Sequence, residues 1–298
     1  MKKVFALAIS AALLMSVVVG CGENKDETSS TQPQTPAETA DVATLDTATP
    51  DAATSDEPTL GKTTFTVGFD AEFPPYGYQD DNGEYTGFDL DLAAEVCDRN
   101  GWELVKKPID WDSKDMELDG EIIDCIWNGF TMNGREDSYT WTDAYVDNSQ
   151  VFVVAADSGI TTKADLSVKT VAVQADSSAL AALTDEEDNE ENLALTNSFA
   201  ELMEVPDYNT AFMNLEAGAV DAIAMDIGVA NYQIASRGDS YIILDEVLAA
   251  EEYGVGFKLG NTELRDAVQK TIDDMRQDGT FLAIAEKWEL QDCVVLDK

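Results

Sequence analysis

Strand and helix patterns alternate along the chain from residue 65 onward, and this alternation is the strongest constraint on the fold. Phe65–Phe69 and Glu103–Ile109 have the composition of strands, and Phe88–Asn100 between them repeats apolar side chains at helical spacing. Gly101 follows where a left-handed helix cap is expected. Alternating strands and helices build βαβ units with mostly parallel strands, so the sequence predicts an α/β fold.

The second half of the chain repeats this organisation. Thr170–Gln174 predicts a strand and Asn209–Ala217 predicts a helix. In each half a helix end, a glycine and a buried strand follow one another, with Asp124–Ile126 and Asp221–Ile223 at corresponding places. This weak internal repeat predicts two lobes, each with its own sheet.

The carboxyl ends of the buried strands indicate where a ligand would bind. Open α/β sheets bind ligands beyond these ends, which are Asn128–Thr131 in the first half and Asp226 in the second. Gln150–Ala155 and Glu252–Phe257 are expected to cross between the lobes as two antiparallel linkers, which together make a hinge. The sequence therefore predicts a cleft between two hinged lobes.

The N-terminus has the pattern of an export signal. Two lysines precede the apolar run Val4–Val19, so residues 1–20 are expected to be a signal peptide, although a plain secretory signal remains an alternative to a lipoprotein signal. Val18–Cys21 resembles a lipobox, in which Cys21 becomes acylated and anchors the protein to a membrane. Residues 21–61 are rich in Thr, Ala, Asp, Glu, Pro and Ser and are expected to form a disordered tether.

Composition removes several classes of function. The chain has 59 acidic and 18 basic residues and a formal net charge of −41, which argues against binding to nucleic acid or anionic lipid. It has no histidine, which excludes Ser-His and Cys-His dyads and histidine-containing zinc sites. The acidic run of residues 185–191 lacks the spacing of a calcium loop. We therefore expect neither a metal nor a cofactor.

Cysteine number leaves one question open. Cys97, Cys125 and Cys293 remain if Cys21 is acylated, and an odd number in an exported protein leaves at least one thiol free or paired between chains. Cys97 and Cys125 are expected either to pack as buried thiols or to form a disulfide.

The first half also resembles a known family. Three segments carry the resemblance: FTVGFDAEFPPYGYQDDNGEYTGFDLDLAAEVC, IDWD and IIDCIWNGFTMNGR. They resemble the first lobe of the extracytoplasmic solute-binding proteins of polar amino-acid ABC importers (bacterial solute-binding protein family 3), and the similarity continues through nearly all of the chain after residue 61. The resemblance implies a type II periplasmic-binding-protein fold with two lobes, whose two mostly parallel sheets are joined by a two-strand hinge. The first lobe would comprise residues 62–151 and 252–298, including two C-terminal helices packed against it, and the second lobe residues 152–251.

Two charged residues are the main candidates for binding the ends of a free amino acid. Arg135 follows a strand end and can offer a planar fork to a carboxylate, which is the role that the resemblance implies; a surface salt bridge with Glu136 or Asp137 is the alternative. Asp226 ends an apolar strand, where a carboxylate needs a cation or several donors, and the resemblance assigns it the α-ammonium. Asp226 can also act as a helix N-cap.

The resemblance extends the site to further residues. The Gly129 carbonyl and the Thr131 hydroxyl would accept from the ammonium, and Asn128 lies at the same strand end. Ser177 and Ser178 begin a helix whose backbone N–H groups can meet the carboxylate. Two departures from the family pattern occur: the loop before Arg135 is one residue shorter, and Asp176 stands where glycine is usual.

Three more residues match positions that surround the ligand side chain. Phe73 and Trp111 would form aromatic walls, and Asp70 would favour a polar or basic side chain. Phe73 can alternatively pack within its own turn, and Asp70 can cap a loop.

The favoured interpretation is a monomeric, lipid-anchored, extracytoplasmic protein that binds a free amino acid, with polar or basic ones preferred, and delivers it to an ABC transporter permease. No enzymatic step and no nucleic acid are expected. One alternative is a dehydratase of cyclic prephenate-like acids on the same fold, with Asp70 or Glu72 as its acid. Another is a signalling or surface-interaction lipoprotein without small-molecule affinity.

The lipobox-like segment gives a first testable prediction. Cys21→Ser should release the protein from the membrane, because the thiol that carries the acyl chain is lost. Radiolabelled palmitate incorporation should mark the wild type and not the variant. An unlabelled and soluble wild type would contradict the lipoprotein interpretation.

Overall fold

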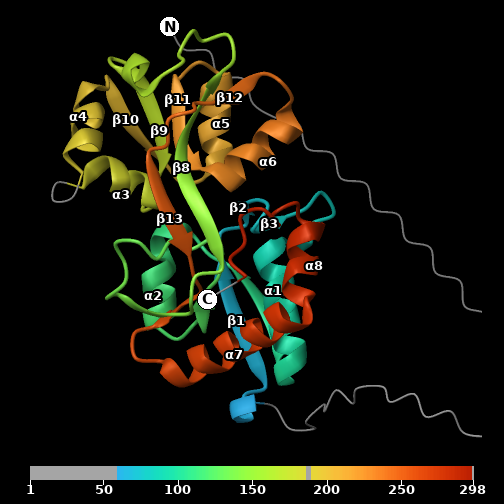
Figure 1. Ribbon diagram of the computed structural model, residues 1–298. Coiled ribbons are helices and arrows are strands. Elements are labelled where there is room, and N and C mark those ends of the chain that lie inside the picture. Colours follow the sequence, from blue (N-terminus) through green and yellow to red (C-terminus); the bar gives the residue numbers. More distant parts are fainter. Residues whose placement is uncertain (1–58, 186–188, 297–298) are drawn as a thin grey trace, which may run out of the picture. The chain divides into compact units, whose positions relative to one another are not determined.

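The computed structural model describes residues 59–185 and 189–296, which belong to one compact unit (Figure 1). The expected signal peptide, Cys21, nearly all of the tether and part of the acidic run lie outside the described residues. Within the described part of the chain, no helix is both long and apolar enough to span a bilayer.

The first sheet has five strands in the order β5-β1-β6-β14-β7. Their bounds are Glu103–Pro108 (β5), Thr64–Phe69 (β1), Cys125–Ile126 (β6), Gly256–Lys258 (β14) and Tyr139–Trp141 (β7). β1 runs parallel to β5 and β6, whereas β14 runs antiparallel to β6 and β7. The strands predicted from the sequence therefore form the parallel half of this sheet.

The second sheet has six strands, five of them in the order β10-β9-β11-β8-β12, with β13 also paired to β8. Their bounds are Glu201–Val205 (β10), Thr170–Gln174 (β9), Ala222–Asp226 (β11), Val146–Ala155 (β8), Tyr241–Ile243 (β12) and Ala249–Tyr253 (β13). Only the β10-β9-β11 part is parallel. Both sheets are thus mixed rather than mostly parallel, because chain segments returning from the other lobe add antiparallel strands to each.

The hinge consists of β8 and β13, which pair antiparallel and run side by side in Figure 1. β7 before β8 and β14 after β13 both belong to the first sheet, so the chain passes between the lobes at this pair. The two expected linkers between the lobes are present, but their bounds differ from the predicted ones. β8 begins at Val146 rather than Gln150, and the second crossing is divided between β13 and β14.

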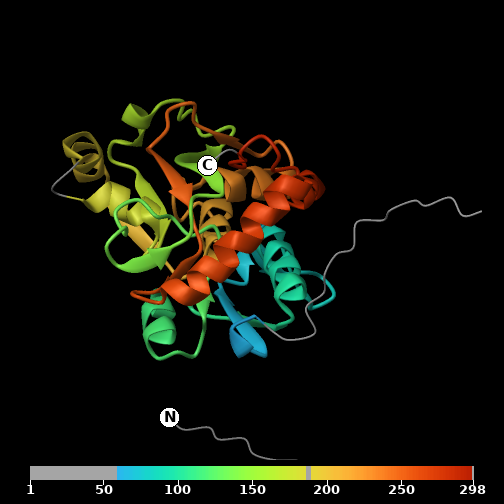
Figure 2. The ribbon, with the colours of Figure 1, turned by 60° about the horizontal axis from the view of Figure 1, so that its bottom comes forward.

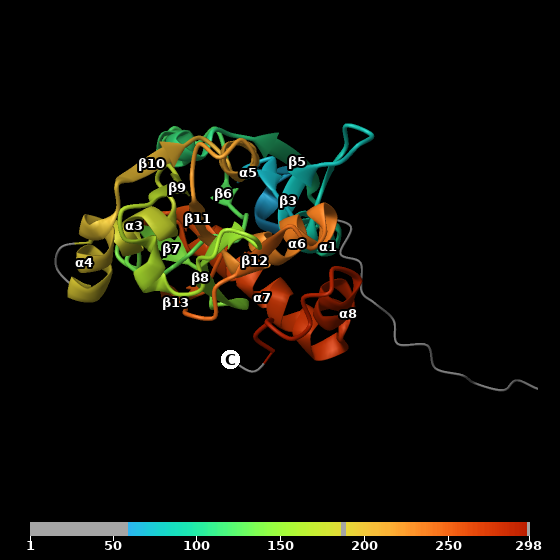
Figure 3. The same ribbon diagram turned by 90° about the horizontal axis from the view of Figure 1, so that it is seen from above.

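Helices cover both faces of the second sheet, as Figure 3 shows. Alternate β9 residues explain this arrangement: Val171 and Val173 pack in one core cluster with Ala179 and Leu183 of α3, whereas Ala172 packs in another with α5 and α6. The bounds in this lobe are Ser178–Thr184 (α3), Glu190–Ser198 (α4), Tyr208–Glu216 (α5) and Ile227–Arg237 (α6). The predicted Asn209–Ala217 helix is confirmed as α5, shifted by one residue.

The first lobe holds α1 (Phe88–Asn100), α2 (Lys114–Asp119), α7 (Thr262–Asp278) and α8 (Thr280–Lys287). A small sheet of β2 (Glu72–Phe73), β3 (Gly77–Gln79) and β4 (Tyr85–Thr86) adjoins it, and short 3-10 turns span Thr59–Gly61 and Trp111–Ser113. A third 3-10 turn, Lys163–Leu166, belongs to the second lobe. The predicted bounds of α1 are confirmed, and Gly101 after it has the left-handed conformation with φ of 68°. α7 and α8 contact α1, so the C-terminal helices pack on the first lobe as expected (Figure 2).

The cysteines of the described chain are free thiols. Cys97 on α1 and Cys125 in β6 are buried, and Cys293 is partly buried. Burial raises the pKa of all three thiols. The interpretation of Cys97 and Cys125 as packed thiols is therefore confirmed.

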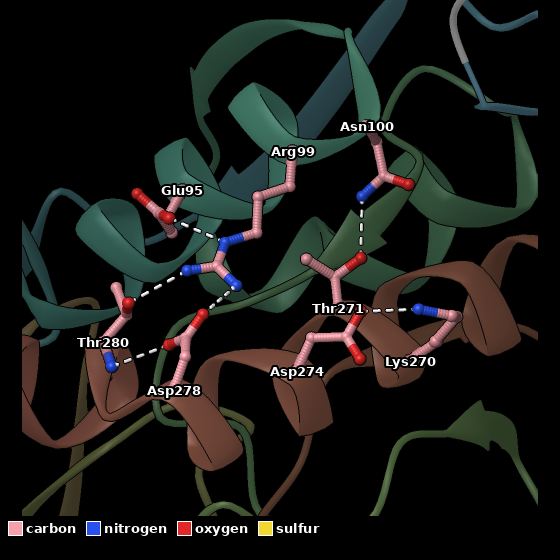
Figure 4. Close-up of polar contacts among 8 residues, drawn as sticks. All are labelled: Glu95, Arg99, Asn100, Lys270, Thr271, Asp274, Asp278 and Thr280. Carbon is pink, nitrogen blue, oxygen red and sulfur yellow. Dashed lines mark hydrogen bonds and ion pairs between the residues drawn. The ribbon is translucent and has the colours of Figure 1, made fainter. Parts of the chain in front are cut away.

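Two kinds of polar contact join α1 to the C-terminal helices (Figure 4). At the surface, Arg99 donates to Glu95, Asp278 and Thr280 over 2.7–2.9 Å. In the interior, Asn100 Nδ2 donates to the Thr271 hydroxyl over 2.8 Å, and both side chains are buried. The buried pair is expected to matter more, because a polar group left unpaired away from water carries its full desolvation cost.

We predict that Asn100→Ala lowers the free energy of unfolding by about 1–3 kcal/mol, because two buried hydrogen bonds of the Asn100 amide, to the Thr271 hydroxyl and to the Val96 carbonyl, are lost. Lys270→Ala is the control on α7, next to Thr271, since its exposed ion pair with Asp274 contributes at most about 0.5 kcal/mol. Urea denaturation followed by circular dichroism measures both. Equal losses in the two variants would contradict the prediction.

Candidate functional site

Strand register places four polar side chains on one face of the second sheet. Asp226 of β11 pairs with Gln150 of β8, and Glu251 of β13 pairs with Asn148 of the same strand. Paired residues share a face, and so do residues two apart along a strand. Asp226, Gln150, Asn148 and Glu251 therefore converge at the hinge, and all four are buried.

Asp226 is surrounded by donors. Its Oδ1 accepts from Gln150 Nε2 at 2.6 Å, Asn148 Nδ2 at 3.0 Å and the Tyr253 hydroxyl at 2.5 Å, and its Oδ2 accepts from the Tyr208 hydroxyl at 3.2 Å. Burial raises the pKa of this carboxyl, and the hydrogen bonds oppose that rise. Asp226 occupies the N-cap position of α6, but its side chain makes no capping hydrogen bond there. Its carboxyl group is directed to the hinge residues instead.

Arg135 lies between the two lobes. Its guanidinium donates to the Thr131 carbonyl of the first lobe at 3.2 Å and to the Asp176 carbonyl of the second at 3.3 Å, and it stacks 5.3 Å from the centre of the Phe130 ring. Among the ion pairs of residues 59–185 and 189–296, none joins Arg135 to Glu136 or Asp137, so the expected alternative of a surface salt bridge is wrong.

Asp176 forms a second link between the lobes. Its backbone is left-handed, with φ of 55°, which explains why glycine suits this position. Its carboxylate pairs with Lys114 of α2, whose side chain is only 2% exposed. Burial lowers the pKa of Lys114, and the Asp176 carboxylate opposes that change. The aspartate is thus the counter-ion of a buried lysine in the opposite lobe.

Gly129 shows why its strand end requires glycine. Its φ is 56°, and a Cβ atom there would lie 2.9 Å from the Phe73 ring and 3.0 Å from the Tyr253 ring. Its N–H donates to Asp89 Oδ2 over 2.6 Å, and the Tyr145 hydroxyl donates to the same oxygen over 2.9 Å. Burial raises the pKa of Asp89 to about 7. Asp89 of α1 therefore holds the backbone N–H of Gly129 in place through this hydrogen bond.

Asp226, Arg135 and Gly129 line a small cavity of about 20 Å³. Its lining residues come from both lobes: Phe73, Trp111, Asn128, Gly129, Thr131, Arg135, Gln174, Ser177, Ser178 and Asp226. Every expected binding residue except Asp70 is among them. Ser177 accepts from the Leu180 N–H as the N-cap of α3, and Ser178 Oγ lies 3.1 Å from the Thr131 hydroxyl.

Two larger cavities share lining residues with the small one. A cavity of about 630 Å³ shares Trp111 with it, and a cavity of about 650 Å³ shares Arg135, Ser177 and Ser178. The first is acidic, with six carboxylate residues in its wall: Asp70, Glu72, Asp110, Asp112, Glu117 and Asp207.

Asp70 links this acidic cavity to the second lobe. Its Oδ2 accepts from Gln174 Nε2 over 2.7 Å, and its Oδ1 accepts from the Glu72 N–H over 2.8 Å. The loop cap considered as the alternative role of Asp70 is therefore present, and its contact with a ligand side chain stays a prediction. Burial is the main cause that raises the pKa of this carboxyl to about 6. Phe73 also packs within its own turn against Tyr76 while lining the small cavity.

Comparison with known proteins decides the family. The model of the bacterial extracellular solute-binding proteins, family 3, matches residues 65–291. The chain belongs to this family. This extracytoplasmic solute-binding protein has the type II periplasmic-binding fold of its structural neighbours, with two lobes around the site described above.

Several relatives of the solute-binding protein carry names that state a ligand. It is 30% identical to the L-cystine-binding protein TcyJ of Escherichia coli strain K12, over 76% of this chain and 82% of the relative. It is 29% identical to the L-cystine-binding protein TcyA of Bacillus subtilis strain 168, over 76% and 81%. A solved structure from Streptococcus pneumoniae is also similar: a substrate-binding protein of an ABC uptake transporter with bound histidine. It is 33% identical in sequence, with a TM-score of 0.73, and the match covers 78% of this chain and 94% of that protein.

Sequence reasoning missed several residues of this solute-binding protein. Asp89 had a usable signal, because it lies on the same helix face as Leu92, Ala93 and Val96, where an acidic residue is costly. Glu251 is in phase with buried Tyr253 along its strand, which is a weaker signal. The contact of Gln174 with Asp70 had no local signal, because the two residues belong to different lobes.

Within the described ranges, no group of three or more Cys, Asp or Glu side chains is arranged to hold a metal ion. The candidate site of this solute-binding protein is built from carboxylates, amides, hydroxyls, aromatic rings and one guanidinium. This set of groups recognises a polar organic solute with both an anionic and a cationic end.

Proposed function

We propose that this solute-binding protein binds a free amino acid between its lobes and delivers it to the permease of an ABC importer. One observation carries the proposal most directly: the cavity at the hinge has a guanidinium from one lobe, a buried carboxylate from the other, and hydroxyl and backbone groups between them. The ligands named for its relatives, cystine and histidine, are amino acids.

The proposed roles follow from charge. Arg135 pairs with the α-carboxylate, because its planar fork can donate two parallel hydrogen bonds. Asp226 accepts from the α-ammonium, and the Gly129 carbonyl and Thr131 hydroxyl are the companion acceptors. The helix start at Ser177 and Ser178 adds donors for the carboxylate. Asn128, Phe73 and Trp111 form the remaining walls.

Binding is coupled to the relative position of the lobes. A pocket for a small molecule has a volume of roughly 300–1,000 Å³, so the residues around the cavity of about 20 Å³ must separate to admit a ligand. Contacts such as Thr131 with Ser178 and Lys114 with Asp176 join the lobes across this cavity. A ligand that touches both lobes adds to these contacts and shifts the population toward closure.

The ligand side chain is proposed to extend toward the acidic cavity beside Trp111. Six carboxylate residues line that cavity, which favours a cationic or hydrogen-bond-donating side chain over an aliphatic or anionic one. Cystine satisfies this requirement through its second ammonium group, and arginine satisfies it through its guanidinium.

No covalent chemistry is proposed. The two carboxyls considered for a dehydratase both have partners, since Asp70 accepts from Gln174 and Glu72 accepts from Asn209. Anchoring through Cys21 remains our proposal for how the protein is held at the membrane. A surface protein without small-molecule affinity is the outcome that a negative binding screen would favour.

The carboxylate role of Arg135 gives a direct test of the function. Arg135→Ala should weaken amino-acid binding by roughly 2–5 kcal/mol, because a charged pair in a desolvated cleft loses one partner. Titration calorimetry with cystine and arginine measures this. Arg99→Ala is a matched control, since Arg99 lies on α1 outside the cavity lining. Unchanged affinity in Arg135→Ala would remove Arg135 from the site.

Ligand choice gives a separate prediction. Asp70→Asn should weaken arginine binding by roughly 1–3 kcal/mol at pH 8 by removing a charge-assisted contact, and it should leave glutamine nearly unaffected. The pKa of Asp70 is about 6, so the wild-type preference for basic ligands should fade as the pH falls below this value. Tryptophan fluorescence titrations with arginine, glutamine, cystine, glutamate and leucine provide the comparison. Tight binding of leucine or glutamate by the wild type would contradict the specificity model.

A further inference from the structure

Two buried carboxyl groups at the hinge share the same donors. Asn148 Nδ2 lies 3.0 Å from Asp226 Oδ1 and 2.7 Å from Glu251 Oε1. Gln150 Nε2 lies 2.6 Å and 2.7 Å from the same two oxygens, and 2.9 Å from Ser178 Oγ. The two carboxyls are therefore neighbours, at 3% and 6% exposure.

The two carboxyls share the amide hydrogens of the same two side chains. The Gln150 amide nitrogen carries two hydrogens and faces three oxygens, and the Asn148 amide must serve both carboxyls as well. All of these donors are neutral. Within the described residues, the buried carbonyl oxygen Oε1 of Gln150 has no hydrogen-bond partner, so an acceptor beside the pair is open to a further donor.

Within the described residues, no lysine or arginine forms an ion pair with either carboxyl. The two nearby basic side chains are engaged elsewhere, Arg135 with the Thr131 and Asp176 carbonyls and Lys114 with the Asp176 carboxylate. The phenols that face the pair are Tyr253 from β13, Tyr208 from α5 and Tyr76 from the loop after β2. Burial raises the pKa of each, so they remain neutral.

Two adjacent buried carboxylates without a cation are unfavourable, and sharing one proton relieves both the repulsion and the desolvation. We propose that Glu251 is a second ammonium-binding carboxyl beside Asp226, and that the pair shares one proton that the ammonium of the ligand displaces. This inference rests on the proposed amino-acid function and assigns a binding role to a hinge residue.

The exchange balances in charge and atoms. Before binding, one carboxyl O–H bond holds the proton, and the pair has one negative charge. On binding, that O–H bond breaks, the proton passes to solvent, and the ammonium N–H groups donate to the two carboxylates. The positive charge lost with the proton is replaced by the positive charge of the ligand.

Titration of the pair sets the pH range. Burial raises the pKa of Glu251 to about 7, with the Asp226 charge as the next cause, and burial also raises the pKa of Asp226. Below about pH 7 the ligand competes with a proton, so affinity should fall by up to about tenfold per pH unit. Above about pH 8 affinity should level off. Asp70 and Asp89 also titrate in this range, so a comparison of variants is required.

The main experiment measures proton release. Titration calorimetry of the full-length protein with L-arginine and L-cystine at pH 6.5, in buffers of low and high ionisation enthalpy, should show release of about one proton per ligand. Glu251→Gln should abolish most of this release and flatten the dependence of affinity on pH. Glu252→Gln is the matched control on the same strand and should release protons like the wild type. Binding without proton release, or equal release in Glu251→Gln, overturns the inference.

A measurement without ligand separates this inference from the proposed function. A carboxyl whose pKa is raised in the folded state destabilises that state once the pH exceeds the unfolded pKa. The melting temperature of the wild type should therefore fall between pH 5 and pH 8 more steeply than that of Glu251→Gln. Parallel profiles overturn the shared proton even if amino acids bind. A steeper wild-type profile supports it even if the proposed ligands fail to bind.

Discussion

The pairing register of β8 with β11 and β13 is the constraint on which the site depends. It aligns Gln150 with Asp226 and Asn148 with Glu251, so that two amides face two carboxyls on one face of the sheet. A shift by one residue would turn these side chains to the opposite face and leave buried groups unpaired. The same two strands cross between the lobes. The site and the hinge are therefore one structural unit, since Asp226 pairs directly with a residue of the hinge strand β8.

The cleft contains two basic side chains, Arg135 and Lys114, although the chain as a whole has a formal net charge of −41. The two positive charges have different partners. Arg135 is held mainly by carbonyl groups, which leaves its positive charge available to a carboxylate. Lys114 is paired with Asp176, where its charge instead stabilises the approach of the lobes. Asp176 accepts a left-handed backbone at this position, and the ion pair offers a physical reason for that departure from glycine.

Local pattern predicted the elements well and their partners poorly. α1 begins and ends where its apolar spacing and Gly101 predicted, and β9 has its predicted bounds. The expectation of mostly parallel sheets was wrong, because β8, β13 and β14 add antiparallel pairs. These strands are short or lie where the chain crosses between the lobes. The strands with which they pair are distant in sequence, so local pattern did not predict the pairing. For the site, residues at strand ends such as Gly129 and Asp226 were predictable from topology and resemblance. Glu251 and Gln174 were not, because their significance arises only from neighbours on other segments.

The sequence by itself determined the family, the α/β alternation, the strand ends that form the site and the charged groups available there, because these depend on local periodicity and on segments that keep their order. The tertiary structure decided which of those groups meet. It brought Asp70 into a hydrogen bond with Gln174, Lys114 into an ion pair with Asp176, and Asp226 next to Glu251. Pairing across the lobes and the hinge depends on register and burial, which fix distances and desolvation between residues far apart along the chain. The charge that each group presents is therefore a property of the folded molecule.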